Sequence, residues 1–165
     1  MPDFEGLLRR LAEHHVDFVI VGGFAAVAHG SSLLTQDVDI CCRFTPDNLM
    51  RLQEALLDLH PVHRMTPKRL PLRLTPQTSE GLQNLYLDTD MGQLDCLGEI
   101  AGIGDFEHAM AQSVEIQLGT VPCRILSLDA LIEAKAAMRR PKDRQVARQL
   151  KAIKAQREKG SGGRQ

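Results

Sequence analysis

One stretch of the chain sets a strand, a pair of glycines, a helix and a second strand in close succession. Residues 17–21 (Asp-Phe-Val-Ile-Val) form a short apolar run that predicts a buried strand, which ends at Gly22 and Gly23. Residues 24–29 have a helical composition, and residues 37–44 predict the second strand. Alternation of strand and helix at this spacing is typical of an α/β chain.

The rest of the chain adds helices and two hairpins around this stretch. Apolar periodicity and capping residues predict helices at residues 4–11, 46–59, 105–112 and 128–138, and from Pro141 onward. Turn residues predict two hairpins, which pair strands 84–88 with 93–98 and 114–118 with 121–126. Residues 60–78 combine four prolines with four Lys or Arg and no acidic residue, which predicts an irregular basic connection with a short strand at residues 70–74.

These elements predict a single α/β (α+β) domain. Its mixed β-sheet should have about five or six strands flanked by helices, with further helices at the C-terminus. A length of 165 residues fits one domain with its own apolar core. We expect the domain to cover residues 1–158, followed by a flexible tail at residues 159–165.

The formal net charge of −1 conceals two oppositely charged parts. Residues 139–165 carry ten Lys or Arg and two acidic residues, whereas residues 1–138 carry ten Lys or Arg and nineteen acidic residues. The basic end favours a polyanionic partner, with a plainly solvated helix as the alternative.

Several classes of protein are excluded by composition. The longest apolar stretch, residues 18–28, is shorter than the ~20 residues that a membrane helix needs. The N-terminus lacks the basic region of a secretory signal. The four cysteines lack the spacing of a zinc site and are expected to be reduced, small hydrophobic residues: Cys41, Cys42, Cys96 and Cys123. These features predict a cytoplasmic protein without a membrane partner.

The chemistry of the chain is concentrated where the second predicted strand begins. Asp37 and Asp39 point to the same face of that strand, where two carboxylates would attract a divalent cation. Gly22 and Gly23 lead into a helix whose first N–H groups are free to bind phosphate. The combination suits a metal–triphosphate complex, although each piece alone is common as a plain turn or a solvated strand edge.

The order of these motifs resembles the nucleotidyltransferase superfamily of polymerase-beta type. The similarity is greatest to small nucleotidyltransferases related to abortive-infection and toxin–antitoxin enzymes. The matching residues are Gly22-Gly23-Phe24-Ala25, His29-Gly30 and Thr35-Gln36-Asp37-Val38-Asp39, and the likeness extends over residues 16–155. It implies the nucleotidyltransferase fold.

The resemblance also implies roles for individual residues. Asp95, an acid within an apolar strand, would be a third carboxylate that shares Mg²⁺ (or Mn²⁺) with Asp37 and Asp39, and a place at an exposed strand edge is the alternative. Lys135 and the run Arg140-Pro141-Lys142-Asp143 are similar to a phosphate-contacting helix and turn, so Lys135 and Lys142, with Gly22 and Gly23, would bind the phosphates. Thr35 and Asp143 are further candidates, and pairing with Lys135 is an alternative role for Asp143.

The implied activity is transfer of a nucleoside monophosphate from a triphosphate such as ATP to a hydroxyl group, with release of pyrophosphate. The acceptor is left open among RNA or tRNA, a protein and a small molecule, and a cognate antitoxin is a further implied partner. Leu33 stands where such proteins often carry arginine, and Gly23 where related enzymes often carry serine. The alternatives are a catalytically inactive nucleotide- or RNA-binding relative and a regulatory interaction protein.

Overall fold

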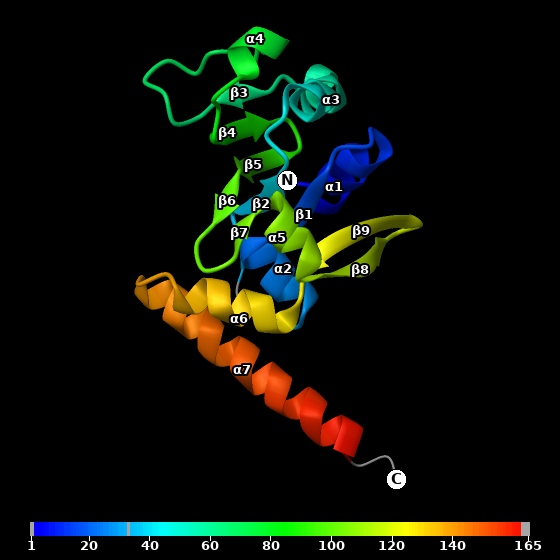
Figure 1. The fold of residues 1–165 in the computed structure, drawn as a ribbon, viewed down its shortest axis with the longest axis vertical. Coiled ribbons are helices and arrows are strands. Elements are labelled where there is room, and N and C mark those ends of the chain that lie inside the picture. Colours follow the sequence, from blue (N-terminus) through cyan, green and yellow to red (C-terminus); the bar gives the residue numbers. More distant parts are fainter. Residues whose placement is uncertain (1, 33, 163–165) are drawn as a thin grey trace.

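A computed structural model describes residues 2–32 and 34–162 of the chain. Its described part centres on a mixed seven-stranded sheet in the order β3-β4-β5-β2-β1-β9-β8, with β6 and β7 forming a separate two-stranded sheet (Figure 1). The strands are β1 (Phe18–Val21), β2 (Asp37–Cys42), β3 (Val62–His63), β4 (Asn84–Thr89), β5 (Gly92–Leu97), β6 (Glu99–Ile100), β7 (Gly104–Asp105), β8 (Ser113–Leu118) and β9 (Val121–Leu126).

The pairing of the strands confirms the predicted hairpins. β4 pairs with β5, and β8 pairs with β9, in both cases antiparallel. β2 lies between an antiparallel β1 and a parallel β5, and β1 also runs parallel to β9. All four residues of β1 are buried, as expected for a strand made of a continuous apolar run. The mixed α/β class is therefore confirmed.

The helices lie around the sheet and at its lower end in Figure 1. They are α1 (Phe4–Glu13), α2 (Gly22–Ala28), α3 (Pro46–Leu56), the 3₁₀ turn η1 (Leu57–Leu59), α4 (Pro76–Ser79), α5 (Phe106–Ala111), α6 (Leu128–Ala136) and α7 (Pro141–Gly162). The side chains of Thr45, Asp105 and Ser127 accept N–H bonds and cap α3, α5 and α6. α2 packs on β1 and β2, α6 on α2, and α7 on α6.

The sheet is larger than the five or six strands expected from the sequence. β3 is only two residues long, which is too short to show an alternating apolar pattern, so it could not be predicted within the irregular connection at residues 60–78. The strand expected at residues 70–74 is absent, and Pro71 makes only an isolated bridge to Val62. Proline cannot donate to a ladder, which explains why this segment does not extend.

All four cysteines are buried, and none forms a disulfide. Burial raises the pKa of the Cys123 thiol to about 11.

Helix α7 continues to Gly162, so it includes the first residues of the segment expected to be a flexible tail. Residues 163–165 lie outside the described part. Within residues 2–32 and 34–162, no helix is long and apolar enough to cross a membrane.

Candidate active site

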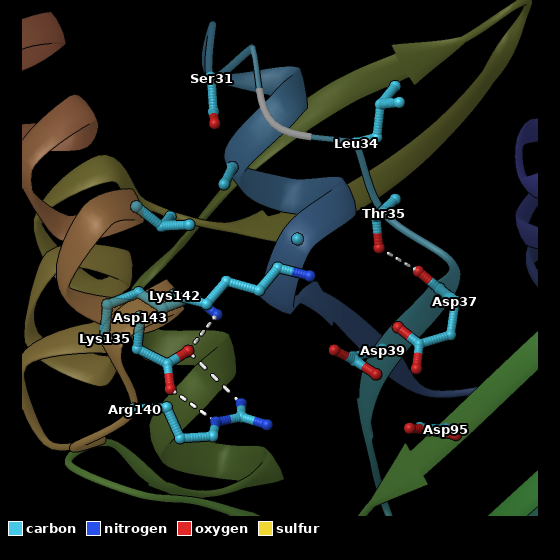
Figure 2. Close-up of a pocket in the computed structure, with 13 residues that line it drawn as sticks. Ser31, Leu34, Thr35, Asp37, Asp39, Asp95, Lys135, Arg140, Lys142 and Asp143 are labelled. Carbon is cyan, nitrogen blue, oxygen red and sulfur yellow. Dashed lines mark hydrogen bonds and ion pairs between the residues drawn. The ribbon is translucent and has the colours of Figure 1, made fainter.

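Three aspartates meet where β2 and β5 lie side by side. Asp37 and Asp39 project from β2, and Asp95 stands directly opposite Asp39 in the parallel ladder. One oxygen atom from each of the three lies within 4.8 Å of the others, and Figure 2 shows them together along one wall of a pocket. The predicted gathering of these carboxylates is therefore present in the fold.

The three carboxylates of the triad repel one another. Burial and the charges of Asp37 and Asp95 together raise the pKa of Asp39 to about 7, against the opposing effect of Lys135. Burial and the Asp95 charge also raise the pKa of Asp37. An all-oxygen donor set of this density suits a hard cation such as Mg²⁺ or Mn²⁺. The residues present therefore fit the metal that the sequence implies.

The raised pKa of Asp39 predicts a pH dependence of stability. A carboxyl group whose pKa rises on folding binds a proton more tightly in the folded state. Protonation of Asp39 therefore stabilises the fold fully below pH 3.8, the ordinary pKa of the group, and this stabilisation is lost as the pH rises through about 7. In chelator, the melting temperature should be lower at about pH 8 than at about pH 5, and Asp39→Asn should reduce this difference. An equal pH dependence in both proteins would contradict the assignment.

A fourth charged side chain, which sequence reasoning missed, lies against the triad. The guanidinium of Arg64 donates through Nη1 to Asp95 Oδ1, and its Nη2 lies 3.8 Å from Asp37 Oδ2. Arg64 follows β3, and its backbone N–H donates to the Tyr86 carbonyl of β4. The signal that could have pointed to it is the acid-free basic segment 60–78, which contains Arg64.

The opposite wall of the pocket is cationic. The pocket has a volume of about 220 Å³, and across it from the triad lie Lys135, Arg140 and Lys142 (Figure 2). Lys135 Nζ lies 3.3 Å from Asp143 Oδ1, and Arg140 Nε donates to Asp143 Oδ2 at 2.8 Å. Asp143 is 2% exposed, so these two cations hold a buried carboxylate at the start of α7. The geometry matches the pairing role considered for Asp143.

The two glycines and Thr35 shape the edge of the triad. Gly22 has a φ of +69°, and a Cβ atom at this position would overlap Asp39 Oδ2. A Cβ atom on Gly23 would come within 2.9 Å of Thr35 Oγ1, which donates to the Asp37 carbonyl at 2.6 Å. Among the residues that the structure describes, no side chain caps α2, which begins with Gly22 and Gly23 after the N-cap residue Val21. Both glycines are therefore explained by close packing against the site.

Most residues singled out from the sequence come together here. Gly22 lies close to Asp39, since a Cβ atom built on it would overlap the Asp39 carboxylate. The pocket is lined by the other candidates, which are Gly23, Thr35, Asp37, Asp39, Asp95, Lys135, Lys142 and Asp143. Leu33, the departure from the motif, lies outside the described residues. The Nε2 atom of His29 lies 2.9 Å from the Leu126 carbonyl, so His29 fixes the end of α2 to β9. His60 pairs with Asp90, and neither residue lines the pocket.

A basic groove adjoins the pocket at Lys135. It has a volume of about 500 Å³ and lies between the end of α6 and one side of α7. Its cationic residues are Lys135, Arg139, Arg144, Arg148 and Lys151, and none of the described residues that line it is acidic. Apart from Lys135, these cationic residues are exposed. Part of the net charge of +8 over residues 139–165 is therefore gathered on one continuous surface.

Comparison with known proteins gives a likeness of fold. No family model and no curated protein sequence matches the chain. A solved structure of ANT(2″)-Ia in complex with adenylyl-2″-tobramycin is similar with a TM-score of 0.54 and 14% sequence identity. The match covers 92% of this chain and 92% of that one. The two proteins share a fold. At this identity the likeness extends to the fold alone.

Proposed function

We propose that the chain is a metal-dependent nucleotidyltransferase, which transfers a nucleoside monophosphate from a nucleoside triphosphate to a hydroxyl acceptor and releases pyrophosphate. The observation that supports this most strongly is the triad of Asp37, Asp39 and Asp95, with oxygens within 4.8 Å of one another, facing a cationic wall. The shared fold with ANT(2″)-Ia, solved with an adenylylated ligand, supports the same reaction class.

The residues divide between the two ends of the reaction. Mg²⁺ or Mn²⁺ held by the triad would polarise the phosphoryl oxygens and lower the pKa of a coordinated hydroxyl. Asp95 is the carboxylate proposed to accept the proton of the acceptor hydroxyl. Lys142, with Lys135 behind it, would neutralise the triphosphate, and the uncapped N–H groups of Gly22 and Gly23 would bind its outer phosphates.

The ligand of the fold neighbour suggests the nucleotide and the acceptor. Adenylyl-2″-tobramycin carries an adenylyl group on a small molecule, which favours ATP as donor and a small-molecule hydroxyl as acceptor. RNA or a protein side chain would be the acceptor in a toxin. That role implies a cytoplasmic location and a cognate antitoxin. An antitoxin would co-purify with the protein from cells and would inhibit its turnover.

Pyrophosphate release tests the activity directly. We expect release in Mg²⁺ with at least one of ATP, GTP, CTP and UTP when tobramycin, total RNA or total protein is supplied as acceptor. Chelation of the metal should stop the release, and the labelled nucleotide should appear in the acceptor fraction. Absence of release with every nucleotide and acceptor class would overturn the enzymatic proposal.

The basic groove favours a second candidate function, RNA binding. Four exposed cations besides Lys135 line the groove, and contacts of this kind bind the phosphate backbone without reading sequence. An RNA-binding relative would use this surface whether or not the triad turns over a nucleotide.

A charge-matched pair of variants tests the groove. Arg144→Gln/Arg148→Gln should weaken binding of a single-stranded RNA oligomer and reduce the slope of log K against log salt by about 1.4, since each phosphate contact contributes about 0.7. Lys68→Gln/Arg73→Gln removes the same charge from exposed positions outside the groove and serves as the control. Equal losses in both double variants would show that only net charge matters.

A further inference from the structure

The side chain of Arg64 is largely buried where it meets the triad. Its side chain is 16% exposed, and the side chain of its partner Asp95 is 12% exposed. Nη1 also lies 3.4 Å from the Leu87 carbonyl, and the guanidinium carbon lies 5.8 Å from the centre of the Tyr86 ring. Strand β4 therefore supplies both the anchor of the backbone and a surface for the guanidinium.

In this position Arg64 neutralises part of the negative charge of the triad, as a metal ion would. A buried carboxylate is unfavourable without a partner, and Asp95 obtains one from a planar cation that also reaches Asp37. Two of the three proposed metal ligands thus share one guanidinium. A divalent cation held by the same carboxylates would lie close to this positive charge, so the two cations compete for the negative charge of the triad.

We propose that Arg64 is the resident counter-cation of the triad and competes with the divalent metal for Asp95. The inference rests on the proposed function, because it takes the triad as the metal site. A divalent metal at the triad would weaken the pairing of Arg64 with Asp95, because the two positive charges repel each other. The Leu87 carbonyl and the Tyr86 ring, which the guanidinium already contacts, would keep it beside the site. Arg64 thereby stabilises the metal-free protein and sets the concentration at which metal binds.

If Arg64 competes with the metal, removing it should lower the stability of the metal-free protein and raise the affinity for metal. Without metal, Arg64→Gln leaves Asp95 buried and unpaired, so the melting temperature should fall. With metal, the competitor is gone, so the affinity should rise by about fivefold or more, a typical size for coupling at linked sites. The rise in melting temperature on adding metal should therefore exceed that of the wild type. A residue with a merely structural role would lower both the stability and the metal affinity.

The experiment is titration of the full chain with Mn²⁺, followed by calorimetry and by thermal melting. We expect the affinity to increase from wild type to Arg64→Lys to Arg64→Gln, because lysine keeps the charge but lacks the fork that spans two carboxylates. If Arg64→Gln does not fold in chelator, the proposal predicts that Mn²⁺ restores its circular dichroism spectrum and that Arg64→Lys still binds more tightly than wild type.

Arg69→Gln is the matched control. Arg69 lies on the same connection and pairs with Asp88 on β4, with its side chain 55% exposed, so its loss should leave the Mn²⁺ affinity unchanged. Equal or weaker Mn²⁺ binding by Arg64→Gln, with binding retained by wild type, would overturn the role of Arg64 alone. Failure of every protein to bind Mn²⁺ would overturn both this inference and the metal site of the proposed function.

Discussion

Asp37→Asn should lower the rate of pyrophosphate release by about 10²–10³-fold or more, the loss typical of removing one preorganised electrostatic group from a site. Asparagine keeps the shape of the side chain but offers a neutral oxygen in place of a charged one. The triad then holds two carboxylates, and Mn²⁺ binding measured by calorimetry should weaken together with turnover.

The same substitution should not destabilise the metal-free protein. Burial and the nearby Asp95 charge raise the pKa of Asp37, which means that its ionised form is disfavoured in the folded state. A neutral residue removes that penalty, although it also loses the 3.8 Å approach to Arg64. We expect a melting temperature in chelator equal to or above that of the wild type, with a smaller rise on adding metal.

Asp58→Asn is a suitable control for Asp37→Asn. Asp58 pairs with Arg10 at the surface, its side chain is 70% exposed, and such a pair contributes little to stability. Its turnover should equal that of the wild type. Retention of full activity by Asp37→Asn, or its loss in both variants, would contradict a role of Asp37 at the reacting centre.

Local patterns in the sequence predict the part of this site that lies on β1, α2 and β2. Alternation along a strand places Asp37 and Asp39 on one face, and the structure has them there. The pairing of Asp95 with Asp39 depends on strand register between segments far apart in the chain. No local pattern gives that register. Asp95 is indicated instead by the resemblance to a family with a third carboxylate and by the cost of burying an acid in an apolar strand.

Arg64 could not be predicted in this way. It reaches Asp95 because a two-residue strand, β3, pairs with β4, and a strand that short has no periodicity to read. An acid between the apolar residues Leu94 and Cys96 needs a cation as partner once it is buried. The sequence leaves open whether that cation is a metal, and the structure supplies a guanidinium as well.

The close approach of β1 to β2 leads to a second prediction with a large effect. Val21 lies opposite Asp39 in the ladder, so the next residue, Gly22, passes against the Asp39 side chain. Gly22→Ala would place a methyl group on Asp39 Oδ2 and near its Cγ, which must turn the carboxylate away from the triad. We expect Mn²⁺ affinity to fall by about 10–100-fold, as when a supporting neighbour of a metal ligand is changed, and turnover to fall with it.

Gly81→Ala separates this displacement from backbone strain. Gly81 has a φ of +79°, close to the +69° of Gly22, but nothing lies within 4 Å of a Cβ atom built on it. Alanine at either position pays about 1–2 kcal/mol for the left-handed backbone, so both variants should lose a similar amount of stability in chemical denaturation. Only Gly22→Ala should lose metal affinity. Equal losses of affinity in the two variants would mean that general destabilisation, rather than the contact with Asp39, connects Gly22 to the site.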